Sequence, residues 1–197
     1  LVIARKIHVC PAFTFQANMV DFGHRLGTDP GFVKLFEREI TDSVASMRQL
    51  YEAGVPLLTG SEAGFSMVPY GHWHYREMEV FRRYYGLTDL QAIQCATQAG
   101  AFALKMQGRV GVIAAGMQAD ILCVAGNPAE DVRILGEPGR IRHVFVDGRA
   151  IDLSPLPERK TLSGWRLPSM GRQLTRDFAL ATDPVPPSPL QPPVEEL

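Results

Sequence analysis

The sequence predicts an α/β protein followed by a smaller β unit and an extended tail. Two apolar segments of strand length, residues 7–15 and 55–59, flank a helical pattern that is long enough to connect parallel strands. Near residue 108 the apolar period changes from about 3.6 to about 2. Prolines accumulate beyond residue 153. We therefore expect three regions, residues 1–107, 108–153 and 154–197.

The first region is expected to open with a strand, a helix and a second strand. In residues 7–15 every second residue falls on one apolar face, Ile7, Val9, Pro11 and Phe13, and a polar loop follows at 16–18. Residues 32–53 predict an amphipathic helix because apolar residues recur every three or four positions, and Gly54 follows where a left-handed cap is favoured. Residues 55–59 form the second predicted strand.

Two further helices are expected before the period changes. Residues 73–85 predict one helix, which Gly86 closes. Thr88 and Gln91 have the spacing of a capping box, which predicts that the next helix runs over 89–105. We expect that helix to bury Leu90, Ile93, Ala96, Thr97 and Phe102.

The later regions predict strands and then an extended chain. Residues 108–116, 119–124 and 141–151 alternate like strands and are separated by Gly, Asn and Pro turns. Residues 183–193 are so rich in proline that most amides are missing or constrained, so we expect the tail to be extended or disordered.

Composition excludes several classes of partner. Twenty Lys and Arg balance 21 Asp and Glu, and no basic block is present, so nucleic acid is not expected. No apolar run reaches the ~18 residues of a membrane span, and no secretory signal opens the chain, so we expect a cytoplasmic protein without membrane contact. Position 1 is not Met, and we expect the chain to begin inside a domain.

Cys10, Cys95 and Cys123 lack metal-site spacing and are expected to be buried thiols.

Glu62 is the acidic residue with the most specific chemical argument. In VPLLTGSEAG, residues 55–64, an apolar strand ends abruptly in small residues and this one carboxylate. The carboxyl end of a buried parallel strand is where barrel and open α/β enzymes present reactive groups. Glu62 is therefore our candidate catalytic residue. The alternative is a carboxylate that only favours a helix N-terminus electrostatically.

The histidines of GHWH, residues 71–74, invite several interpretations. His72 and His74 could bind a metal, but residues two apart at a helix start do not share a face. They could instead contact substrate together with Tyr70 and Trp73, or simply cap the helix or lie on the surface. We place His72, His74 and Tyr70 in the substrate pocket. His8, His24, His143 and Asp120 are expected to be structural.

Three segments resemble a known family: VPLLTGSEAGF at 55–65, LTDLQAIQCATQAGA at 87–101 and GRVGVIAAGMQADILCV at 108–124. They are similar to the C-terminal part of the amidohydrolase superfamily, in its imidazolonepropionase-like and prolidase-like branch. In that family G-x-I-x-x-G-x-x-A-D leads from the last barrel helix into a small β-sandwich, and V-x-V-x-G, here 144–148, supplies a later strand. The resemblance covers about residues 5–153.

The resemblance implies a partial (β/α)8 barrel, comprising the last two strands and helices, followed by strands of a small β-sandwich. Residues 7–15 would be strand seven and 55–59 strand eight. The family's divalent metals are bound by HxH on strand one, Lys or Glu on strand four, histidines on strands five and six, and an acid on strand eight. Glu62 would occupy that acidic position, as general base and metal ligand, although the family usually has Asp there.

The function implied is the metal-dependent hydrolysis of C–N bonds in amide or peptide-like small molecules by a metal-activated water. Strands one to six have no counterpart here, so zinc or another divalent metal would be held mainly by residues outside this chain. The partner would be an N-terminal barrel segment or another chain of an oligomer, and an exposed apolar flank should face it. The isolated chain is expected to be inactive.

Two alternatives remain open at this point. One is a non-catalytic relative that acts as a structural or regulatory subunit, which the Glu at position 62 favours. The other is an independent α/β binding module with a pocket lined by Tyr70, His72, Trp73 and His74. The second alternative needs a sheet of only two barrel strands, and buried parallel strands need cover on both faces.

Overall fold

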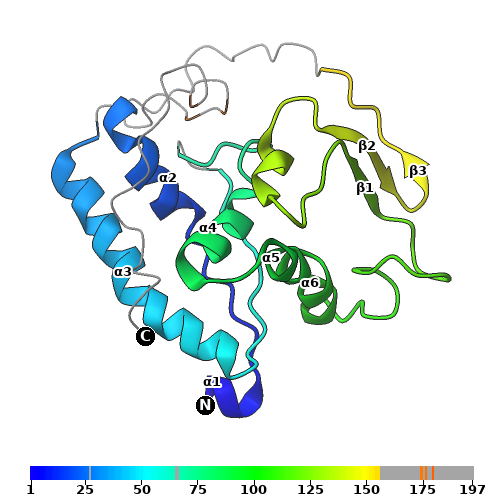
Figure 1. Cartoon of the computed structure of the whole chain (residues 1–197), viewed down its shortest axis with the longest axis horizontal. Coiled ribbons are helices and arrows are strands. Elements are labelled where there is room, and N and C mark those ends of the chain that lie inside the picture. The colour runs from blue at the N-terminus through cyan, green and yellow to red at the C-terminus, as the bar shows by residue number, and fades with distance from the viewer. Residues whose placement is uncertain (27, 65–66, 156–173, 175, 177–178, 180–197) are drawn as a thin grey trace.

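The computed structural model describes residues 1–26, 28–64 and 67–155 and the single residues 174, 176 and 179. Figure 1 shows α4 between the long helix α3 on one side and the small sheet on the other. The elements of the described chain are α1 (Val2–Arg5), α2 (Thr14–Phe22), the 3₁₀ helix η1 (Gly23–Leu26), α3 (Pro30–Glu52), α4 (Arg76–Tyr85), α5 (Asp89–Ala96), α6 (Gln98–Ala103), β1 (Ile121–Val124), the 3₁₀ helix η2 (Val132–Gly136), β2 (Ile141–Val146) and β3 (Arg149–Ala150).

The two expected parallel strands meet at a single bridge. Val9 pairs with Leu57 in parallel, through hydrogen bonds from the Val9 amide to the Pro56 carbonyl (3.1 Å) and from the Leu58 amide to the Val9 carbonyl (2.8 Å). The predicted strand over 7–15 is otherwise wrong, because α2 begins at Thr14 and includes the expected loop 16–18. Alternation of apolar residues could not reveal this, since Ala12 turns the chain with a φ of 56°.

The helices α3 and α4 agree with the sequence pattern. Before α3, Asp29 caps the helix by accepting from the Gly31 amide (2.8 Å), and Pro30 occupies its first turn. Gly54, which follows α3, has the predicted positive φ of 75°. Helix α4 begins at Arg76, three residues later than predicted, because residues 74 and 75 form a turn.

The expected third helix is divided into α5 and α6 at Thr97, where φ is −123° and ψ is −78°. The predicted inner face is wrong for Leu90, Thr97 and Phe102, all three of which are exposed. Small residues face the core instead: Ala92, Cys95 and Ala101. Gly111 lies very close to α6, because a Cβ on Gly111 would be only 2.7 Å from the Cβ of Ala101. Small residues at this contact therefore allow the segment after α6 to pack closely on the helix.

The capping box of α5 is formed as predicted and gives a direct test. The Thr88 hydroxyl accepts from the Gln91 amide (3.2 Å), and the Gln91 side chain accepts from the Thr88 amide (2.8 Å). We expect Thr88→Ala to lower the free energy of unfolding by about 1 kcal/mol, because a helix-terminal donor loses its acceptor.

Urea unfolding of Thr88→Ala beside Thr41→Ala checks this. Thr41 is exposed in the middle of α3 and bonds only to the Glu37 carbonyl of its own helix, so its replacement should change stability by less than about 0.5 kcal/mol. Equal losses in the two variants would contradict the assigned cap.

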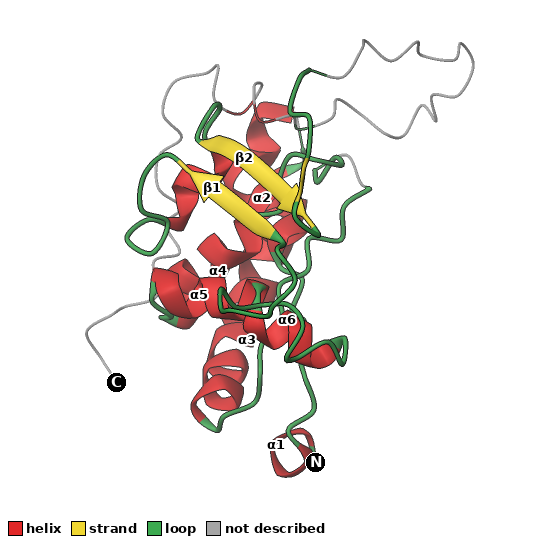
Figure 2. Ribbon diagram, turned by 90° about the vertical axis from the view of Figure 1, so that its right-hand side faces the viewer, coloured by secondary structure: helices red, strands yellow, loops and turns green. Residues whose placement is uncertain are grey.

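The sheet is small, open and antiparallel, with the order β1-β2-β3 (Figure 1). Figure 2 shows β1 and β2 side by side. Ile121 pairs with Phe145, and the register shifts between Cys123 and Val124. Residues 108–116 form turns and bends rather than the predicted strand. The predicted single strand over 141–151 is a hairpin, because Asp147 and Gly148 both take positive φ.

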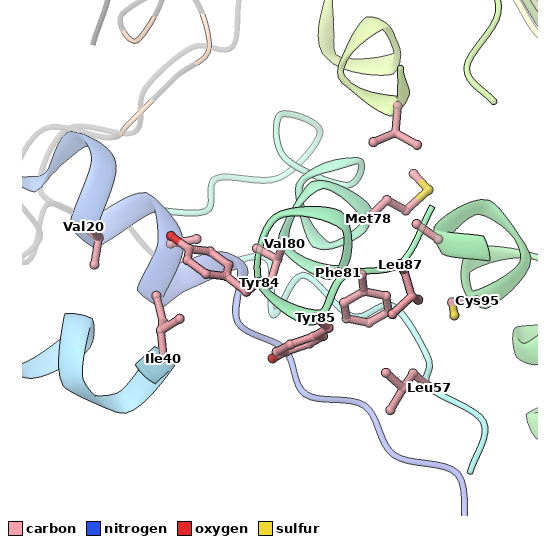
Figure 3. Packing of buried hydrophobic residues seen from close by; sticks show 13 residues of the cluster. Val20, Ile40, Leu57, Met78, Val80, Phe81, Tyr84, Tyr85, Leu87 and Cys95 are labelled. Carbon is pink, nitrogen blue, oxygen red and sulfur yellow. The ribbon is translucent and has the colours of Figure 1, made fainter. Parts of the chain in front are cut away.

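In the main core, side chains from α2, α3, α5 and residues 55–59, which we call the Leu57 segment, pack around α4. Figure 3 shows Tyr84 toward Val20 and Ile40, and Phe81 and Tyr85 on the side of Leu57. The buried members of this cluster are Ala17, Val20, Ile40, Leu57, Met78, Val80, Phe81, Tyr84, Tyr85, Leu87, Ala92, Cys95 and Val132.

A second cluster includes residues of the expected tail. Leu174 and Ala179 are buried beside Trp73, whose indole Nε1 donates to the Leu174 carbonyl (2.8 Å). These residues of the region 154–197 therefore pack on the helices. Residues 183–193, on which the prediction of an extended tail rests, lie outside the described residues. Within the part of the chain that is described, no helix combines the length and apolar character needed to cross a membrane.

Candidate active site

Glu62 lies in an exposed loop directly after the Leu57 segment. We call residues 60–64 the Glu62 loop. The backbone at Glu62 has a φ of 48°, a region that residues other than glycine seldom adopt. The Gly64 amide donates to the Val68 carbonyl (2.9 Å), and this hydrogen bond holds the end of the loop close to Val68. Strained backbone of this kind collects at functional sites, which fits the predicted role.

Two of the three predicted pocket residues lie beside the Glu62 loop. A Cβ on Gly64 would lie 3.0 Å from the Tyr70 hydroxyl oxygen, so the Tyr70 ring covers this end of the loop while staying 74% exposed. At the other end, Ser61 Oγ lies 3.5 Å from His74 Nδ1. Tyr70 and His74 therefore flank the segment that carries the carboxylate.

The third predicted pocket residue, His72, has a different neighbour. Its Nδ1 accepts from the Arg176 amide (3.2 Å), and Trp73 between the two histidines is buried. The two histidines of GHWH thus contact different segments. Across the described residues, no group of three or more His, Cys, Asp or Glu side chains could hold a metal ion.

The ends of the two parallel segments converge at Cys10. Residues 10–13, which we call the Cys10 turn, follow Val9. The Cys10 sulfur lies so close to Gly60 that a Cβ at position 60 would require the sulfur to shift. Partial burial of the sulfur, together with the negative charges of Glu77 and Glu62, raises the pKa of the Cys10 thiol, although the residue as a whole is exposed. Cys10 is exposed, contrary to the prediction of buried thiols, whereas Cys95 is buried as expected.

The structure adds a residue that the sequence analysis missed, Glu77. Its side chain is fully buried, with Oε1 accepting from the Phe13 amide (3.0 Å) and Oε2 accepting from the Thr14 hydroxyl (2.6 Å). The available signal was its spacing of four from both Trp73 and Phe81, which places it on the apolar face.

Burial raises the pKa of Glu77 to about 7, even though its hydrogen bonds favour the charged form. Because the folded-state pKa lies above the ordinary value of 4.5, folding favours the neutral acid. The resulting stabilisation is complete below about pH 4.5 and is lost as the pH rises through about 7, by about 3 kcal/mol in total. We expect Glu77→Gln to abolish this part of the pH dependence.

The measurement is urea unfolding of both proteins at pH 4.5, 6 and 8. The free energy of unfolding of the wild type should fall relative to Glu77→Gln as the pH rises. A difference between the two proteins that stays constant across this range would contradict the assignment to Glu77.

A buried ionic network holds the chain just beyond the Glu62 loop. Arg76 forms an ion pair with Asp21, and it donates to Glu79 (2.5 Å) and to the Asn18 side-chain oxygen (3.0 Å). Asn18 in turn donates to the Met67 carbonyl (2.8 Å). Burial alone would lower the pKa of Arg76, but the two carboxylates outweigh burial and raise it above its ordinary value.

Comparison with known proteins points to one family. Residues 3–151 match the model of the amidohydrolase family. Ochratoxinase from Aspergillus niger is 32% identical over 65 residues, which are 32% of this chain and 14% of that protein.

Two solved structures have a similar fold. A prolidase in complex with N-methylphosphonate-L-proline matches with a TM-score of 0.63 and 25% identity, over 76% of this chain and 36% of its own. A putative prolidase from Bifidobacterium longum matches with a TM-score of 0.64 and 22% identity, over 87% of this chain and 38% of its own. The chain thus spans little more than a third of these structures.

Proposed function

Because the chain belongs to the amidohydrolase family, we propose that it is the C-terminal portion of a hydrolase acting on C–N bonds of small amides or peptide-like molecules. The observation that carries this proposal is the position of Glu62. This carboxylate follows a segment in parallel pairing and lies in a strained, exposed loop flanked by Tyr70 and His74. A reactive acid at the carboxyl end of a parallel strand fits the architecture of barrel enzymes.

We also propose that the chain forms the last two strands of a (β/α)8 barrel, in the segments around Val9 and Leu57. The parallel bridge between Val9 and Leu57 supports this. The stacking of His8 on Phe102 brings the N-terminal segment against α6, and exposed apolar side chains in these two parts of the chain would leave a flank for a further segment: Leu1, Ile3, Ile7, Phe102 and Leu104. The partner would be the N-terminal barrel segment, in the same polypeptide or in another subunit of an oligomer.

The described residues do not complete a metal site by themselves. Glu62 could supply one ligand, and the remaining ligands would come from outside this chain. A bound divalent ion, for which we propose zinc, would supply a water whose pKa is lowered to near 7. Glu62 would orient the attacking water, accept its proton and return that proton to the leaving amine.

The proposed substrate contacts are Tyr70, His72 and His74. Tyr70 presents its largely exposed ring beside the Glu62 loop, and His74 lies near Ser61. A prolidase and an ochratoxinase among the similar proteins support a peptide-like or amide substrate. For His72 the support is its place in GHWH, two residues before His74, and its Nδ1 accepts from the Arg176 amide.

A non-catalytic subunit is the second candidate. It is favoured by the longer Glu at the acidic position and by the exposure of that side chain. Such a subunit would keep the fold and the partner but would not need the carboxylate.

A reconstitution assay tests the proposal. The chain alone, the upstream barrel segment alone and the two joined would be incubated with zinc and an Xaa-Pro dipeptide or an N-acyl amino acid. Hydrolysis only by the joined protein is the expected result. Full activity of the chain alone would overturn the proposal, and so would a joined, folded and metal-loaded protein that cleaves neither class.

A further inference from the structure

Glu77 connects two parts of the chain that are far apart in sequence. Its Oε1 binds the Phe13 amide and its Oε2 binds the Thr14 hydroxyl, at the junction of the Cys10 turn and α2. Glu77 itself lies in α4, the helix that follows the Glu62 loop. The carboxylate therefore joins the segment after the first parallel strand to the helix after the second.

The surroundings of Glu77 show that hydrogen bonds, not ion pairs, hold it. Among the described residues it has no Lys, Arg or His partner. The negative charge of Glu77 contributes to raising the pKa of Cys10 in the Cys10 turn and of Tyr85 in its own helix. A fully buried carboxylate without a cation is costly, so its retention needs the donors at residues 13 and 14.

The joined segments are the two that frame the candidate active site. Val9, directly before the Cys10 turn, pairs with Leu57, and the Cys10 sulfur lies against Gly60 at the start of the Glu62 loop. A shift of the Cys10 turn would therefore be transmitted to the backbone that carries Glu62. Displacements of about 1 Å can lower catalytic rates by about 100-fold.

We propose that Glu77 is a positioning residue for the proposed hydrolysis, fixing the Cys10 turn against α4 and thereby the place of the Glu62 loop. This inference rests on the proposed function. Glu77 does not touch the reacting atoms in this proposal. It acts through the Phe13 amide and the Thr14 hydroxyl.

The test compares three variants of the joined protein: Glu77→Leu, Glu77→Gln and Val80→Ala. Leucine removes both acceptors, whereas glutamine keeps an acceptor for the Phe13 amide. Val80 is 1% exposed in the same helix and its side chain has no polar atom, so Val80→Ala lowers stability without removing a hydrogen bond to the Cys10 turn. Each variant would be assayed for kcat and KM and for amide hydrogen exchange over residues 10–16.

We expect Glu77→Leu to lower kcat by about 100-fold with little change in KM, and to speed exchange over residues 10–16. Glu77→Gln should restore most of the kcat, and Val80→Ala should change neither kcat nor that exchange. An active wild type in which Glu77→Leu has no larger effect on kcat than Val80→Ala would overturn the positioning role alone. An inactive wild type would overturn the proposed function and this role together.

Discussion

Replacing Glu62 by glutamine is expected to lower kcat of the joined enzyme by about 10²- to 10⁴-fold, because the amide cannot accept a proton from water. The side chain is exposed in a loop, so the fold should not depend on it. KM should change little if the carboxylate acts on the water rather than on the substrate. Initial rates over a range of substrate concentrations, for proteins matched in metal content, give both constants.

Two variants control this experiment. Glu52 is an exposed carboxylate at the end of α3, and Glu52→Gln should leave kcat unchanged. Glu62→Asp shortens the side chain by one methylene and should retain more activity than Glu62→Gln, since it keeps the proton acceptor. If Glu62→Gln is as active as the wild type, Glu62 is not the general base, and the non-catalytic subunit becomes the better account.

Replacing Arg76 by methionine is expected to destabilise the protein by about 3 kcal/mol, because Glu79 loses its pair with Arg76 and the buried Asp21 keeps Arg83 (2.7 Å) but loses Arg76. Asp21 is 8% exposed, and Arg76 is the central member of its network. The same change frees Asn18, which holds the Met67 carbonyl beyond the Glu62 loop. Urea unfolding, monitored by circular dichroism, gives the loss.

The matched control is Arg133→Met. Arg133 forms an ion pair with Asp131 (2.7 Å), but its side chain is 57% exposed. Exposed pairs contribute about 1 kcal/mol or less, so this variant should unfold near the wild-type midpoint. Comparable losses in the two variants would show that the buried network does not stabilise the fold as described.

Local patterns predicted the helices better than the strands. The periodicity of α3 and the capping box at Thr88 are short-range signals, and the structure agrees with both. The strand predicted over 7–15 failed after Val9 because the start of α2 depends on Glu77, a residue more than 60 positions away. Residues 108–116 alternate like a strand but form turns, since alternation does not supply a pairing partner.

The candidate site was only partly accessible from sequence. Glu62 was identified because it follows an apolar segment, and Tyr70 and His74 were predicted to share its site because they are close to it in sequence. The structure places both residues beside the Glu62 loop. Glu77 was missed because its burial depends on donors from a distant turn. The contact between His72 and the Arg176 amide links residues 104 positions apart, which no local pattern could predict.

The central claim is that Glu62 works beside a metal held by residues outside this chain. Its most direct test is a crystal structure of the joined protein grown with zinc, with the ion located by anomalous scattering at the zinc edge. We expect zinc bound by ligands of the upstream segment, with the Glu62 carboxylate coordinating it or within hydrogen-bond distance of its water. Zinc bound in the barrel with Glu62 directed away from it would contradict the account.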